Sequence, residues 1–193
     1  MPLRAPPGRA GRLWLVRRLA VARRGVDVLD QKRQTLLREQ QRLSEVLAAA
    51  TQDWELKARA AAGWNDRALA IAGERRLRLA AAPGGRRCEV EVEWRNALGT
   101  AFPAGASVHL GPEPDFVALG GGSVVAFAAR AHAEAVVAAA GYAAARAAHE
   151  AVTAELAATA RRQRATTRSC TRSAGSPSAL APIDHGSRWS ASA

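Results

Sequence analysis

The sequence predicts a mainly α-helical fold: a long antiparallel two-helix coiled coil with a small β-hairpin-like insertion between the helices. Three observations predict it: an apolar heptad seam from Leu15 to Ile71, an alternating segment from Cys88 to Arg95, and an alanine-rich run after Gly122. Alanine favours helix but buries little area, and only 5% of the 193 residues are aromatic. An extended helical pair therefore fits the composition better than a globule.

The seam places an apolar residue alternately every four and every three positions, which is the heptad pattern of a coiled coil. Its positions are Leu15, Leu19, Ala22, Val26, Leu29, Arg33, Leu36, Gln40, Leu43, Leu47, Ala50, Trp54, Lys57, Ala61, Trp64, Ala68 and Ile71. Unbroken from Leu13 to Ala72, this helix would be roughly 90 Å long at about 1.5 Å per residue. Arg33 and Gln40 are polar at core positions, where they would set the register of the pair at some cost in stability.

The insertion begins where Pro83, Gly84 and Gly85 end the first helix. From Cys88 to Arg95 apolar and charged residues alternate, which predicts a strand with one buried face and one solvated face. The buried face comprises Cys88, Val90, Val92 and Trp94, and the solvated face carries Glu89, Glu91 and Glu93. Asn96 to Pro114 is rich in loop-forming residues, with a second short strand expected at Ser107 to Leu110.

The second helix is expected to start at Ser123, a suitable N-cap, and to end near Ala165. Its alanines would let the first helix approach closely in an antiparallel pair. After Arg164 the chain is rich in serine, threonine and proline, which predicts a disordered basic tail. The expected segments are an N-terminal helix at 1–82, a β and loop insertion at 83–122, a C-terminal helix at 123–165 and a divergent tail at 166–193.

Positive charge is concentrated at the two ends of the chain, which has a formal net charge of +11. Met1 to Arg24 contains seven arginines and no acidic residue, and Leu156 to Ala193 contains six arginines and only Asp184. Such ends can bind nucleic acid, anionic lipid or an acidic protein surface, and charge alone does not choose among them.

The sequence contains no catalytic, cofactor-binding or metal-binding constellation, so no site residue and no cofactor is predicted. The four histidines, at positions 109, 132, 149 and 185, stand in separate contexts and are expected to be solvated or capping residues. The run from Gly120 to Ser123 lacks the lysine of a phosphate-binding loop and is expected to act as a hinge into the second helix.

The two cysteines match no metal-ligand spacing, and they indicate a protein of the reducing cytosol. Cys88 is expected to be a buried strand residue, and Cys170 lies in the polar tail. The apolar run from Leu13 to Val21 is too short and too rich in arginine to span a bilayer.

The chain resembles the D subunit of V-type and archaeal A-type ATPases over about Pro6 to Arg164. The residues that carry the resemblance are Pro6-Pro7-Gly8-Arg9-Ala10, Leu15, Arg17-Arg18-Leu19-Ala20, Arg23-Arg24-Gly25, Leu29, Lys32-Arg33, Leu36-Leu37-Arg38-Glu39, and Leu98-Gly99 with Pro103. The order of long helix, short strand and second long helix is similar as well.

The resemblance implies a non-catalytic rotor shaft in the central stalk of a proton- or ion-translocating ATPase, which transmits torque between the catalytic ring and the membrane rotor. The implied partners are the catalytic and nucleotide-binding ring subunits, the small F subunit of the stalk, and the component that couples to the membrane rotor. The implied location is cytoplasmic and peripheral to the membrane, with no direct membrane insertion. Trp54 and Trp64 on the seam are expected in the core, and Trp14 can lie against the ring.

The alternative interpretation is a basic helical coiled-coil protein that binds nucleic acid or serves as a scaffold. No recognition helix, zinc module or aromatic stacking module accompanies the charge, which argues against nucleic acid. A scaffold would explain the heptads but not the β insertion.

The chain departs from the family pattern after Arg164, where members continue a long amphipathic second helix. The switch from alanine-rich helix to arginine, serine, threonine and proline resembles a change of reading frame, which we state as a hypothesis. An intact amphipathic helix in another frame of the gene would support it, and the lack of one would exclude it.

Overall fold

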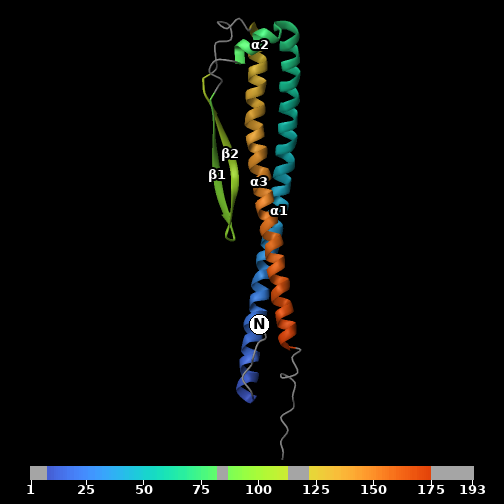
Figure 1. Cartoon of the computed structure of the whole chain (residues 1–193), viewed down its shortest axis with the longest axis vertical. Helices are drawn as coiled ribbons and strands as arrows, with labels where there is room; N and C mark the ends of the chain where they lie inside the picture. The colour runs from blue at the N-terminus through green and yellow to red at the C-terminus, as the bar shows by residue number, and fades with distance from the viewer. Residues whose placement is uncertain (1–7, 82–86, 113–121, 175–193) are drawn as a thin grey trace, which may run out of the picture. The chain divides into compact units, whose positions relative to one another are not determined.

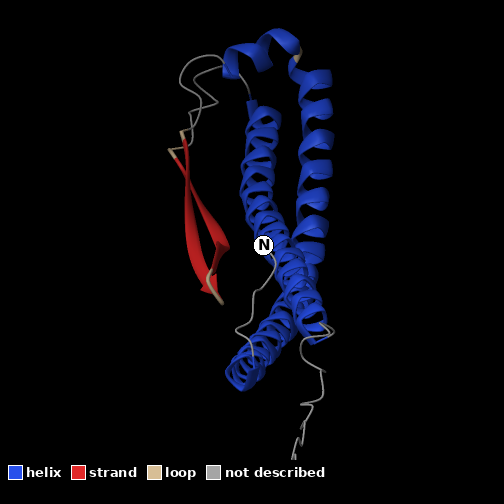
Figure 2. Cartoon of the chain, turned by 60° about the horizontal axis from the view of Figure 1, so that its bottom comes forward, coloured by secondary structure: helices blue, strands red, loops and turns tan. Residues whose placement is uncertain are grey.

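The computed structural model describes residues 8–81, 87–112 and 122–174, and these residues form three helices and one β-hairpin. The helices are α1 (Gly8–Ala72), α2 (Glu74–Ala81) and α3 (Gly122–Ala174), and the strands are β1 (Cys88–Ala97) and β2 (Thr100–Leu110). Figure 2 shows the hairpin as the only strand structure among the described segments. The predicted fold class, two long helices with a small hairpin between them in the chain, is confirmed.

The chain divides into two compact units. The central unit comprises residues 35–156, and the terminal unit comprises residues 1–34 and 157–193. Each unit therefore contains one part of α1 and one part of α3.

The central unit has its core where α1, α3 and the hairpin meet. Phe102 of β2 is fully buried against Leu36 and Leu43 of α1 and against Ala148 and Val152 of α3. Figure 1 shows α1 and α3 side by side in this unit, with the hairpin next to α3. One aromatic side chain thus attaches the hairpin to both helices.

The first helix is interrupted at Gly73, whereas the sequence predicted a single helix up to residue 82. Gly73 has a φ of +80°, a left-handed conformation that glycine adopts without steric cost. Its N–H donates to the carbonyl of Leu69 at 3.0 Å, as in a helix C-terminal cap, and α2 then starts at Glu74. Gly25 and Gly63 lie within α1 and do not interrupt it.

The hairpin is longer than the sequence predicted, because β2 starts at Thr100 and not at Ser107. Ala97 pairs with Thr100 around a two-residue turn in which Leu98 and Gly99 both have positive φ. Glu93 pairs with Gly105 but Trp94 pairs with Pro103, so Ala104 is the extra residue of a β-bulge. Proline and glycine are tolerated at a bulge, and the loop expected from Asn96 onward is therefore largely strand.

Helix α3 continues to Ala174, past the expected end near Ala165. The hydroxyls of Thr166 and Thr167 donate to the carbonyls four residues earlier, at 3.0 and 2.9 Å, a geometry that a helix accommodates. No proline occurs before Pro177 to stop the helix. The remainder of the expected disordered tail lies outside the described residues.

Candidate functional site

The residues with a possible mechanical role are those that join α1 to α3 in the central unit. Four side-chain pairs cross between the helices. They are Gln40 with Thr153 (Nε2 to Oγ1, 3.0 Å), Trp54 with Tyr142 (ring centroids 5.0 Å), Lys57 with Glu134 (Nζ to Oε2, 2.8 Å) and Trp64 with Phe127 (ring centroids 5.0 Å). Because the α3 partner moves back as the α1 residue moves forward, the two helices are antiparallel.

The terminal unit has a cross-helix pair of its own. The Gln163 side-chain amide donates to Asp30 Oδ1 at 3.2 Å, and Gln34 donates to the other oxygen of that carboxylate at 2.9 Å. Thr159 is fully buried in this unit, and Leu15 is buried as well. Both units therefore hold α1 and α3 together through side-chain contacts.

The predicted seam is confirmed along nearly its whole length. From Leu15 to Ala68, every seam position except Arg33 is buried or half-buried. Gln40 fills its polar seam position by bonding to Thr153, whereas Arg33 is exposed and does not enter the core. Ile71 at the end of the seam is also exposed, at 73%.

The two seam tryptophans are half-buried and stack on aromatic residues of α3. Trp54 lies nearly parallel to Tyr142, with 12° between the ring planes, and Trp64 lies at 21° to Phe127. Trp14 in the terminal unit is half-buried, with the Arg18 guanidinium 5.2 Å from its ring centroid. The expectation that Trp54 and Trp64 belong to the helix interface is thus confirmed.

Two ion pairs of the central unit change the pKa of their members. The hydrogen bond from Arg42 lowers the pKa of Glu39, with a smaller contribution in the same direction from the charges of Arg42 and Arg95. The hydrogen bond to Glu134 raises the pKa of Lys57, and the charge of Glu134 acts in the same direction. Lys57 is a charged residue at a seam position, and its pairing with Glu134 across the helices explains why it is tolerated there.

Charge is divided unequally between the two units. The sequence of the terminal unit holds fifteen basic residues and three acidic ones, whereas the central unit holds thirteen basic and fourteen acidic residues. The net charge of +11 therefore belongs entirely to the terminal unit, because the central unit is nearly neutral. An anionic partner is favoured at one unit and not at the other.

The hairpin differs from its prediction in burial. Val90, Val92 and Trp94 are 52%, 40% and 69% exposed, so the face expected to be buried is largely open. The alternation correctly placed these residues on one face, but the hairpin packs on the helices through Phe102 near its tip. The opposite face carries Glu89, Glu91 and Glu93, which are exposed as expected.

Cys88 is exposed, which corrects the expectation of a buried thiol. It lies at the start of β1, far along the strand from the turn residues that pack on the helices. Cys170 lies within α3, not in a tail without structure.

The histidines occupy separate environments, as the sequence predicted. His109 is exposed, with Nε2 3.8 Å from a carboxylate oxygen of Glu91, and His132 Nδ1 lies 2.8 Å from the carbonyl of Ala128. Within the described residues, no three side chains of histidine, cysteine, aspartate or glutamate are placed to hold a metal ion. His185 and most of the expected glycine hinge, Gly120 and Gly121, lie outside those residues.

Within the described segments, one helix is long and apolar enough to cross a membrane, over Gly122–Ser169 of α3. This property rests on length and composition, and most of the apolar character comes from alanine. The same helix packs on α1 through the Trp54 and Trp64 stacks and through Lys57. A helix that packs on a partner helix in this way passes the same test, so the property is weak evidence for a membrane span.

Comparison with known proteins identifies the family. The sequence profile of the ATP synthase D subunit matches residues 13–167, which covers most of the chain and ends near the change of composition after Arg164. No curated protein matches the chain. The matched residues contain the seam, the hairpin and all four cross-helix pairs of the central unit. The chain therefore belongs to the ATP synthase D-subunit family, that of a stalk component of V- and A-type rotary ATPases.

Proposed function

We propose that the chain is the rotor shaft in the central stalk of a V- or A-type ATPase and transmits torque between the catalytic ring and the membrane rotor. Its role is non-catalytic, and the ATP chemistry belongs to the ring. It works on the cytoplasmic side, peripheral to the membrane and without inserting into it. The proposed partners are the catalytic and nucleotide-binding ring subunits, the small F subunit of the stalk and the component that couples to the membrane rotor.

The observation that carries the proposal is the set of cross-helix contacts along the seam. A single helix bends and twists readily, whereas two helices joined at several points must slide past each other to deform. Aromatic stacks at Trp54 and Trp64 resist separation, and polar pairs at Gln40 and Lys57 oppose a shift of register. These are the properties that torque transmission needs.

Exposed apolar side chains support the proposal from a different direction. Phe127, Val136 and Val137 of α3 are 42–48% exposed, and several valines and leucines of α1 are exposed to a similar extent or more. Large exposed apolar area is typical of surfaces that bind other proteins. A protein that works inside an assembly accounts for this exposure.

Single-molecule rotation tests the proposal. The chain would be co-expressed with the catalytic and nucleotide-binding subunits of the same organism and with the small F subunit, and the ring would be fixed to a surface. A bead attached to the exposed Cys88, in a Cys170→Ser background, should rotate in one direction when ATP is added. The same complex without ATP is the control. ATP hydrolysis by an assembled complex without rotation of the bead would exclude the shaft role.

A further inference from the structure

The N-terminal part of α1 carries a second line of residues on the side opposite the seam. Leu13, Arg17, Val21, Arg24 and Val28 follow one another at spacings of four, four, three and four, so they lie along one face of the helix. Leu13, Arg17 and Arg24 each stand two positions before a seam residue, which corresponds to about 200° around the helix. We name these five residues the outer stripe.

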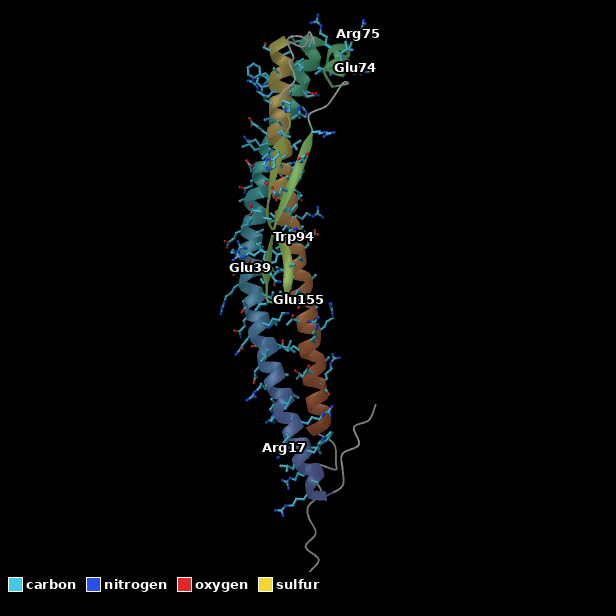
Figure 3. The ribbon with its side chains drawn as sticks, turned by 90° about the vertical axis from the view of Figure 1, so that its left-hand side faces the viewer. Arg17, Glu39, Glu74, Arg75, Trp94 and Glu155 are labelled. Carbon is cyan, nitrogen blue, oxygen red and sulfur yellow. The ribbon has the colours of Figure 1, made fainter. Side chains whose placement is uncertain are left out.

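The outer stripe is exposed and alternates between aliphatic and cationic side chains. Leu13, Val21 and Val28 are 54%, 73% and 57% exposed, and Arg17 and Arg24 are exposed as well. Arg17 is labelled on this part of α1 in Figure 3. No acidic residue occurs between Gly8 and Val26, and none occurs in the described part of α3 within the same unit, residues 157–174. The charge of the stripe is therefore not balanced by acidic residues of its neighbours along these two segments.

The chemistry of the stripe selects among anionic partners. Phosphates of a nucleic acid would pair with Arg17 and Arg24 but would leave the exposed aliphatic side chains without apolar contact. A membrane surface would take up the aliphatic side chains only on a continuous apolar face, and the two arginines interrupt that face. A protein surface on which carboxylates alternate with aliphatic side chains satisfies both kinds of residue.

The spacing of the arginines adds a geometric condition. Arg17 and Arg24 are seven residues apart on a continuous helix, which separates them by roughly 10 Å along its axis. Two carboxylates seven residues apart on a partner helix have the same separation. An aliphatic residue between them would meet Val21.

We propose that the outer stripe binds an acidic protein surface of the catalytic ring, one that carries carboxylates about two helical turns apart with aliphatic side chains between them. The inference rests on the proposed function for the identity of the partner, and it adds the chemistry of the contact. Electrostatic attraction draws the terminal unit to the ring, and the aliphatic residues provide contact area that is not sensitive to salt.

Binding to the ring at several salt concentrations tests the inference. The full chain would be titrated onto a complex of the catalytic and nucleotide-binding subunits, and the Kd would be measured from low to moderate sodium chloride. The test variant carries Arg17→Gln and Arg24→Gln, which keep helix propensity and side-chain length. The control variant carries Arg75→Gln and Arg76→Gln, which remove the same charge from exposed positions of α2 in the central unit.

We expect the test variant to bind about tenfold more weakly at low salt and to lose part of the salt dependence, while the control variant changes by less than about twofold. A third variant, Val21→Ser with Val28→Ser, should weaken binding without changing the salt dependence. Equal weakening by the test and control variants would show that only overall charge matters and would overturn the inference.

Two further outcomes separate this inference from the proposed function. If the wild-type chain binds the ring and the test variant binds equally well, the stripe inference fails and the shaft proposal stands. If the wild-type chain does not bind the ring, the shaft proposal fails, and duplex DNA and vesicles of phosphatidylserine are tested next. Loss of binding to either probe in the test variant would identify a nucleic acid or a membrane as the occupant and would overturn the inference.

Discussion

The Gln40 side-chain amide donates a hydrogen bond to the hydroxyl of Thr153, with 3.0 Å between the two atoms, and this bond joins α1 to α3 in the central unit. Gln40 occupies a seam position that the heptad pattern would give to an apolar residue. Sliding one helix along the other would break this bond and leave two polar groups without a partner in the interface. The pair therefore specifies the register of the two helices.

A double-mutant cycle on this pair should measure its contribution. Gln40→Leu alone leaves the half-buried Thr153 hydroxyl without its partner and should cost about 1 kcal/mol in the free energy of unfolding. The combination of Gln40→Leu with Thr153→Val removes both polar groups and should recover most of that loss. Urea unfolding followed by helix circular dichroism gives the four free energies. Additive single effects would show that the two side chains do not interact.

The stack of Trp54 on Tyr142 should contribute to stability more than an exposed tryptophan does. Trp54→Ala removes a half-buried ring from the helix interface and should destabilise the chain by about 1–3 kcal/mol, less than a fully buried aromatic would cost. Trp94→Ala is the matched control, because Trp94 is 69% exposed on the hairpin, and its effect should stay within about 0.5 kcal/mol. Equal losses in thermal unfolding would contradict the assigned role of the stack.

The seam shows how far a heptad pattern determines contacts. The period of the pattern identified almost every α1 residue that packs on α3, because side chains at this spacing share one face of a helix. The pattern did not identify Thr153, Glu134 or Tyr142 as partners, since an alanine-rich helix offers many registers of similar energy. One cross-helix pair is enough to fix the others, because in each pair the α3 residue moves back by about as many positions as the α1 residue moves forward.

The hairpin shows what alternation leaves open. Alternation states which residues of β1 share a face, but burial depends on whether another element covers that face. Here Phe102 and the bulge at Ala104 direct the packing through the tip of the hairpin, and Val90, Val92 and Trp94 remain exposed. Pro103 indicated a loop because proline cannot donate to a β-ladder, yet a bulge accommodates it.

Phe102 should control attachment of the hairpin to the helices. Phe102→Ala empties a fully buried site and should destabilise the chain by about 3–5 kcal/mol. Since the hairpin has few other buried side chains, its amides should exchange with solvent faster than those of α1 and α3. Hydrogen exchange of β1 measures this effect, with Val92→Ala as the control on the exposed face. Uniform acceleration over the whole chain would argue against local detachment.

Glu39 should make stability depend on pH in the acid range. Its pKa is lowered mainly by the hydrogen bond from Arg42, so the native state favours the charged carboxylate. The resulting stabilisation is complete above the ordinary pKa of 4.5 and is lost as the pH falls through the lower native pKa. Because the Arg42 side chain is 47% exposed, the contribution should be below about 0.5 kcal/mol.

Glu39→Gln should therefore flatten the dependence of the urea midpoint on pH below about pH 4.5, while leaving the slope at higher pH unchanged. Glu45→Gln on the exposed side of α1 is the control for loss of one carboxylate. Parallel curves for Glu39→Gln and the wild-type chain would mean that the Arg42 hydrogen bond does not favour the charged form.

The turn at Leu98 and Gly99 should gain stability from an asparagine. Leu98 has a φ of +53°, which a leucine adopts at a steric cost, whereas asparagine tolerates this conformation and the pair Asn-Gly is favoured in two-residue hairpins. Its side chain is 47% exposed, so little apolar burial is lost on replacement. Leu98→Asn should slow hydrogen exchange of the hairpin by an amount equivalent to about 0.5–1 kcal/mol.

Two further variants at the turn separate backbone conformation from side-chain contact. Leu98→Ala removes the side chain but keeps a residue that disfavours positive φ, so it should not stabilise the hairpin. Gly99→Ala should weaken the hairpin, because Gly99 has a φ of +86° that alanine rarely adopts, even though open space surrounds the position. If Leu98→Asn speeds exchange instead, the leucine side chain stabilises the turn by more than its conformation costs, and contacts at the tip outweigh backbone strain.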